Sequence, residues 1–206
     1  MINYIVGELN KGKHDLIPDI FELYKFGFEN DKILIHNGIV DSVNFRSAVN
    51  VACHLEELTW AENFIANYQS YLEPKVRLEN TAIANSMLLF EQGKFEQVIQ
   101  NIDKHKFVEI HSIIMTRVYD LKSRYELKEI EELDTKSESF IRFVNRSKKL
   151  GEKNKSAAIQ FGRILIHLVH RKLSKDKLMH EIQNTVHLYS KDWLVKKQKE
   201  YKPINT

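Results

Sequence analysis

The stretch Phe90-Glu91-Gln92-Gly93-Lys94-Phe95-Glu96-Gln97-Val98-Ile99 decides the fold class. Before it, residues 79–92 place apolar and small side chains at helical spacing, and Gly93 supplies the left-handed conformation that commonly ends a helix. From Phe95 onward, apolar residues follow at i, i+3, i+4 and i+7, the spacing of a second amphipathic helix. The stretch therefore predicts a helix, a tight turn and another helix.

Two other segments, residues 55–65 and 125–133, align with this one without gaps. The large central residues of the three segments are Trp60, Phe95 and Ile130, and successive positions are 35 residues apart. One pair of helices cannot bury its apolar stripe alone, whereas stacked neighbours can. A fixed step of this length therefore predicts helical repeats.

The segment 90–99 resembles the turn and second helix of a tetratricopeptide repeat: an aromatic, two residues, Gly, one residue and another aromatic. Ser86 stands where that motif has a small residue for close helix packing. The other two segments depart from the motif, with Leu58 and Lys128 at the glycine position and Asn63 at a small-residue position. The resemblance implies an antiparallel helix-hairpin array that curves into an α-solenoid.

A second resemblance covers more of the chain. Residues 23–29, 37–38, 60–65 and 139–143 are similar to uncharacterised helical-repeat proteins of the Bacteroidetes, in particular to their C-terminal part. It implies a bacterial protein and a chain that forms part of a longer one. It brings no established activity.

We therefore expect an all-α fold of about nine to eleven helices in one helical-repeat domain, 1–206. Its parts are N-terminal helices in 1–43, three divergent hairpins in 44–146 and basic capping helices in 147–206.

Local signals place several of the flanking helices. Residues 15–30 read as a helix with Pro18 in its first turn, and Asn37-Gly38 marks a loop. Further helices are expected over 134–149 and 155–173, followed by two helices with Ser174 and Ser190 as N-caps.

Composition excludes several classes of protein. Only 7 Gly and 3 Pro oppose an all-β fold, which needs many turns, and one Cys forbids an intramolecular disulfide. The N-terminus lacks the features of a signal peptide, and the apolar run 159–169 is too short and too polar to span a bilayer. We expect a cytoplasmic protein with no membrane partner.

Catalytic and metal-binding motifs are absent from the sequence. There is no Gly-rich phosphate loop, no Gly-x-Ser-x-Gly and no His-Glu-x-x-His. Cys53 and His54 are adjacent on a helix and do not face each other, so Cys53 is expected to be a small buried residue. We expect no enzyme and no cofactor, with an unrecognised active site as the alternative.

Two further kinds of site, a metal site on histidines and an acid–base pair of glutamates, are disfavoured by the spacing of these residues. His167 and His170 share a predicted helix face, and zinc would need His180 and His187 as well, without a standard spacing. We therefore expect no metal site. The glutamates between 126 and 132 are expected to form a solvated helix face.

Charge is segregated along the chain. Residues 142–206 carry 16 Lys and Arg against 5 Asp and Glu, whereas residues 1–141 carry 15 against 23. Such asymmetry points to a partner surface for an acidic protein, for the acidic 1–141 part of another chain, or for phosphate groups of a nucleic acid. A solvated basic face or a protein partner is favoured over a nucleic acid, because aromatics for base stacking are sparse. The candidate contacts are Arg146, Lys148, Lys149, Arg171 and Lys172.

Polar residues at one helix position suggest a second surface. Asn50, Asn85 and Asp120 follow at steps of 35 residues, and amides in register can hydrogen-bond an extended peptide. In some tetratricopeptide domains, such asparagines clamp a C-terminal carboxylate, although Asp120 adds the opposite charge. The predicted function is a non-catalytic protein–protein interaction scaffold for an unidentified protein or peptide.

Overall fold

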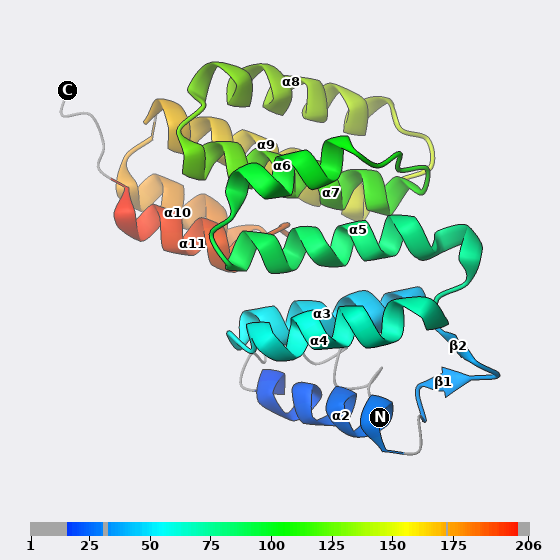
Figure 1. Cartoon of the computed structure of the whole chain (residues 1–206). Coiled ribbons are helices and arrows are strands. Elements are labelled where there is room, and N and C mark those ends of the chain that lie inside the picture. Colours follow the sequence, from blue (N-terminus) through cyan, green and yellow to red (C-terminus); the bar gives the residue numbers. More distant parts are fainter. Residues whose placement is uncertain (1–15, 31–32, 172, 202–206) are drawn as a thin grey trace. The chain divides into compact units, whose positions relative to one another are not determined.

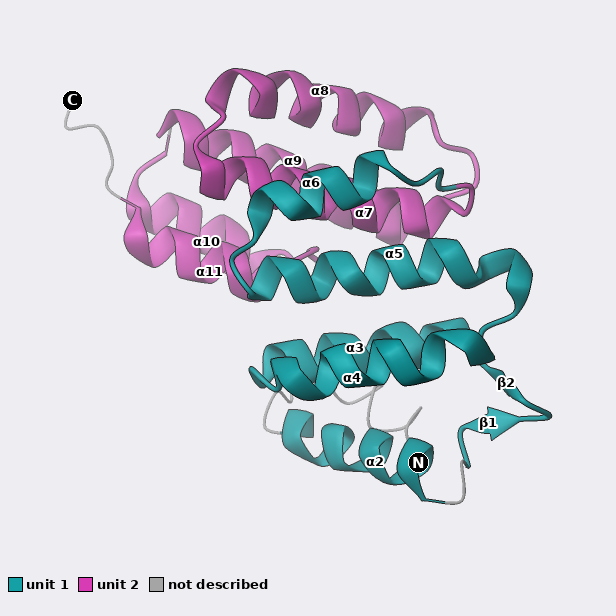
Figure 2. Ribbon diagram, viewed as in Figure 1, with its two compact units in different colours: residues 1–107 teal, residues 108–206 magenta. Residues whose placement is uncertain are grey.

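Helices account for most of the computed structural model, which describes residues 16–30, 33–171 and 173–201 (Figure 1). Within these ranges the chain forms ten α-helices, one 3-10 helix and one short pair of strands. The expected all-α class is confirmed. The chain divides into two compact units, 1–107 and 108–206 (Figure 2).

Unit 1 packs its helices around a cluster of aromatic rings. Phe28, Phe45 and Phe64 are buried, with the Phe64 ring centroid 4.7 Å from Phe28 and 5.4 Å from Phe45. These rings join α2, α3 and α4, and α5 packs against α3, α4 and α6. The helices are α2 (Ile17–Glu29), α3 (Ser42–His54), α4 (Leu58–Tyr68), α5 (Pro74–Glu91) and α6 (Phe95–Asp103), with 3-10 helix η2 (Gln69–Tyr71).

Unit 2 is built around α9, which packs against α8, α10 and α11. A methyl group on Gly162 would lie 2.9 Å from Ile141 Cγ1, so glycine permits the close approach of α8 and α9. Phe140 and Phe161 are buried beside this contact. The helices are α7 (Ile110–Leu127), α8 (Ile130–Arg146), α9 (Glu152–His170), α10 (Lys175–Asn184) and α11 (Lys191–Glu200).

Three helix pairs are joined by turns of the same geometry. Each turn holds one residue in the left-handed conformation: Glu56 (φ 61°), Gly93 (φ 72°) and Lys128 (φ 62°). In each turn, that residue donates its backbone N–H to the carbonyl three residues earlier, and the next residue donates to the carbonyl five residues earlier. These are the two hydrogen bonds of a Schellman motif. Lys128 therefore stands at the turn position where the repeat motif has glycine, as the sequence predicted.

The register predicted for the first turn is wrong by two residues. The left-handed residue there is Glu56, and Leu58 begins the next helix. The turns are therefore 37 and 35 residues apart. Phe95 and Ile130 lie two residues after their left-handed residues, whereas Trp60 lies four after its own. Their surroundings differ as well: Trp60 and Phe95 are half-buried, and Ile130 is 42% exposed.

Several expected helix signals are confirmed. Pro18 lies in the first turn of α2, and the Ser174 hydroxyl accepts the Lys177 backbone N–H at the start of α10. Ser190 precedes α11 but takes a left-handed conformation (φ 52°) and makes no capping hydrogen bond. The expected helices 134–149 and 155–173 begin three or four residues too late and end three too late, because helix ends leave the weakest sequence signal.

Asn37 and Gly38 form a tight turn between β1 (Ile35–His36) and β2 (Ile39–Val40). Both turn residues have positive φ, 52° and 76°, as a two-residue hairpin turn of type I′ requires. The sequence indicated only a loop at this position.

Candidate interaction surface

The predicted row of polar residues does not form. Asn50 is exposed on α3 and Asn85 is half-buried on α5, whereas Asp120 is 8% exposed inside unit 2. The Asp120 carboxylate accepts Arg124 Nε at 2.9 Å and pairs with Lys136 Nζ at 3.0 Å. Asn50 is also two positions out of register, because the first turn comes earlier than the sequence suggested. The Asp120 carboxylate is therefore engaged inside unit 2, and Asn50 and Asn85 are not at equivalent helix positions.

The glutamates of the α7–α8 turn are only partly a solvated face. Glu131 and Glu132 are exposed, as expected. Glu126 Oε1 instead accepts the Trp193 indole N–H at 2.7 Å, and Glu126 Oε2 pairs with Lys197 Nζ at 2.9 Å. Glu129 Oε2 pairs with Arg124 Nη1 at 2.7 Å. These carboxylates fasten α11 and α8 to α7, so they are structural rather than solvated.

The candidate basic residues form two separate groups. Arg146 ends α8, Lys148 and Lys149 follow in the loop before α9, and all three are exposed; Arg171 is exposed at the other end of α9. A helix of 19 residues is about 28 Å long, so the structure does not bring the two groups together. Lys172 lies outside the described residues.

Further cations lie where the start of α10 meets the end of α11, shortly after Arg171 in the chain. Lys175 Nζ donates to the Lys199 carbonyl at 2.9 Å, and Gln198 Nε2 donates to the Lys175 carbonyl at 2.9 Å. The Tyr201 hydroxyl donates to the Leu173 carbonyl at 2.6 Å. These bonds join the first turn of α10 to the last turn of α11. We call the exposed cations on or next to these helix ends in the chain the C-terminal basic cluster: Arg171, Lys175, Lys177, Lys196 and Lys199.

Local carboxylates do not neutralise this cluster. Asp176 and Glu200 lie among the five cations along the chain, and Glu200 is itself bound by Lys197 at 3.2 Å. A hollow of about 460 Å³ adjoins the cluster, lined by Leu173, Asp176, Lys177, His180 and Glu181. The sequence named Arg171 as a candidate contact but did not indicate that Lys175 and Lys199 meet.

Cys53 is buried on α3, as the sequence predicted. Burial, with a smaller contribution from the Glu91 carboxylate, raises the pKa of the Cys53 thiol to about 12. The thiol therefore stays protonated at neutral pH and is a poor nucleophile.

Of the two histidines that the sequence places on one face of α9, His170 binds a protein group, whereas the buried His167 Nδ1 atom has no hydrogen-bond partner among the described residues. His170 Nε2 lies 2.7 Å from Asp134 Oδ1, which links the end of α9 to α8. Among residues 16–30, 33–171 and 173–201, no three His, Cys, Asp or Glu side chains come together as metal ligands would.

Comparisons with known protein families, curated proteins and solved structures gave no match. Within the described ranges, every helix is too short or too polar to span a bilayer.

Proposed function

We propose that the chain is a non-catalytic protein-interaction scaffold of the tetratricopeptide-like type, and that the C-terminal basic cluster holds an acidic segment of its partner. The observation that carries this proposal is the joining of two helix ends by three hydrogen bonds, which sets five exposed cations on ordered backbone. A surface that is already ordered loses little entropy when it binds. Unit 2 as a whole carries 21 Lys and Arg against 13 Asp and Glu.

The aromatic residues of this region favour a protein partner over a nucleic acid. Phe161 is fully buried and Tyr201 is 6% exposed. Trp193 packs edge-on against Tyr125 with ring centroids 5.2 Å apart, and its N–H is held by Glu126. These rings are committed to the core of unit 2, so they offer no platform for base stacking, on which binding of single strands relies.

Charge reversal tests the proposal on the full chain. The variant Lys177→Glu/Lys199→Glu changes two exposed side chains, and the control Lys94→Glu/Lys106→Glu makes the same charge change on unit 1. Fluorescence anisotropy would follow a labelled oligoglutamate peptide and a labelled single-stranded oligonucleotide at several salt concentrations. We expect the first variant to weaken peptide binding about tenfold, and the control to change it little.

Two outcomes would contradict this proposal. Equal losses in both variants would mean that only net charge matters. Tighter binding of the oligonucleotide than of the peptide, with a steep loss on adding salt, would replace the protein partner by a nucleic acid.

A further inference from the structure

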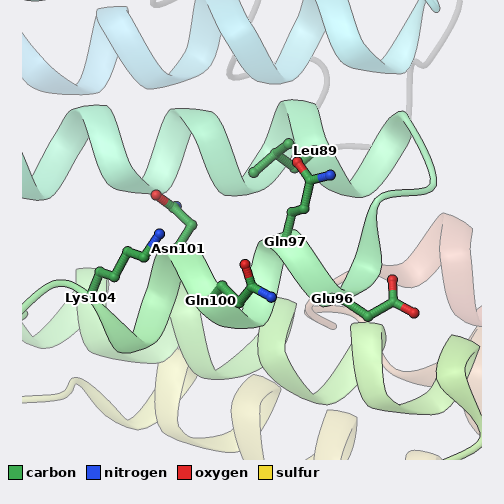
Figure 3. A pocket seen from close by; sticks show the side chains of 6 residues that line it. All are labelled: Leu89, Glu96, Gln97, Gln100, Asn101 and Lys104. Carbon is green, nitrogen blue, oxygen red and sulfur yellow. The ribbon is translucent and has the colours of Figure 1, made fainter.

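Unit 1 carries a polar groove between α5 and α6 that the sequence did not indicate (Figure 3). Its volume is about 570 Å³. We call it the α5–α6 groove, and its lining residues are Leu89, Glu96, Gln97, Gln100, Asn101 and Lys104. It differs from the C-terminal basic cluster in both its chemistry and its unit.

Helical spacing arranges the α6 side chains in two rows. Gln97 and Asn101, four residues apart, extend toward α5 and Leu89. Glu96, Gln100 and Lys104 form the outer row, also at steps of four. Residues four apart lie on the same helix face, so an amide stands between a carboxylate and an ammonium group. This arrangement gives the groove one apolar side chain on the α5 side, three amides and opposite charges at its two ends.

Asn101 is held in one orientation. Its Nδ2 donates to the Ala82 carbonyl at 2.8 Å and to the Ser86 hydroxyl at 2.9 Å, and Ser86 is fully buried. An asparagine amide has two N–H donors, and both are used here. The free hydrogen-bonding capacity of Asn101 is therefore its Oδ1 acceptor, which suits an N–H group of a ligand.

The charged ends of the groove are available to a ligand. Glu96 and Lys104 are exposed, and neither forms an ion pair with any residue that the structure describes. Eight residues of helix separate them by about 12 Å. An extended peptide advances about 3.3 Å per residue, so about four residues fit between the two charges.

We propose that the α5–α6 groove binds an extended peptide of about four residues, with a basic side chain at Glu96 and an acidic group at Lys104. The Asn101 Oδ1 atom accepts a backbone N–H of the peptide, and the side-chain amides of Gln97 and Gln100 pair with its remaining backbone groups. This second protein-binding site goes beyond the proposed function. Because its residues lie on unit 1, its failure is distinguishable from failure of the basic cluster.

Three blocked peptides of equal length test the charge order on the full chain: Arg-Ser-Ser-Asp, Arg-Ser-Ser-Arg and Asp-Ser-Ser-Asp, each flanked by glycine. Their binding at millimolar concentration would be followed by NMR through the side-chain amide signals of Gln97, Gln100 and Asn101. We expect Arg-Ser-Ser-Asp to bind about threefold more tightly than the other two, as exposed ion pairs allow. The variant Glu96→Lys should reverse this order in favour of Asp-Ser-Ser-Asp.

Trp60 emission checks that unit 1 of the variant is folded, since the half-buried Trp60 ring packs against Phe21 and Phe64. The proposal would be overturned if none of the three peptides shifted the side-chain amide signals of Gln97, Gln100 and Asn101. So would equal affinities for the three peptides, or an order that Glu96→Lys leaves unchanged.

Discussion

Exchange of glycine between two equivalent turns tests the shared turn geometry. Gly93 (φ 72°) and Lys128 (φ 62°) have the same left-handed conformation and the same pair of backbone hydrogen bonds. One position has the residue that this conformation favours and the other does not. We therefore expect Gly93→Ala to destabilise unit 1 and Lys128→Gly to stabilise unit 2.

The expected change in the free energy of unfolding follows from two opposing contributions. A left-handed conformation costs a residue with a Cβ atom about 1–2 kcal/mol. Glycine loses more backbone entropy on folding, which offsets about 0.5–1 kcal/mol of that difference. A Cβ atom at Gly93 would meet no atom within 4 Å, so no steric clash adds to the balance. The free energy of unfolding should fall by about 1 kcal/mol in Gly93→Ala and rise by about the same in Lys128→Gly.

Urea unfolding can report each unit separately, because Trp60 lies in unit 1 and Trp193 in unit 2. Gly93→Ala is measured with Trp193 replaced by Phe, and Lys128→Gly with Trp60 replaced by Phe. Ser147→Gly is the control in unit 2, because Ser147 has an ordinary φ of −67° and should gain nothing from glycine. Destabilisation by Lys128→Gly, or an equal gain in Ser147→Gly, would refute the left-handed turn.

Three further outcomes follow from the contacts and surroundings of Glu126, Glu109 and Cys53. Glu126→Ala should destabilise unit 2 by about 2 kcal/mol and shift Trp193 emission, since it leaves the indole N–H without its acceptor and Lys197 with Glu200 alone. An unchanged spectrum would contradict this docking of α11. Burial acts to raise the pKa of Glu109, but hydrogen bonds from the backbone N–H groups of residues 111 and 112 outweigh it and lower the pKa. The stability that Glu109 contributes is therefore present above its ordinary pKa of 4.5 and is lost as pH falls through the lowered value. Denaturation curves of Glu109→Gln and the parent should accordingly differ at neutral pH and converge in acid. Cys53, with its pKa near 12, should react with a thiol reagent only at the rate of unfolding; rapid labelling of the native chain would show that it is accessible.

Sequence signals located the helices well where the signal is local. Gly93 ends α5, Pro18 lies in the first turn of α2 and Ser174 caps α10, each as predicted. Each of these signals acts within a few residues of the backbone it controls. Apolar spacing likewise predicted that Cys53 would be buried.

The first turn shows where local signals mislead. Its left-handed position is filled by Glu56, a residue type that gives no turn signal, so the alignment placed the turn at Leu58. That shift of two residues put Asn50 in line with Asn85. The same alignment put Asp120 on a presumed open face, although Arg124 and Lys136 neutralise it inside unit 2.

The amino-acid sequence by itself determined the helical class, most helix positions and the excess of cations toward the C-terminus. Only the tertiary structure decided which charges are available for binding. It brings Glu126 to accept a hydrogen bond from Trp193, 67 residues away, and Lys175 to donate one to the Lys199 carbonyl, 24 residues away. It also left Glu96 and Lys104 exposed at the two ends of one groove. The physical reason is that helix period and capping act over one or two turns of backbone, whereas an ion pair or a groove depends on which helix ends the packed core brings together.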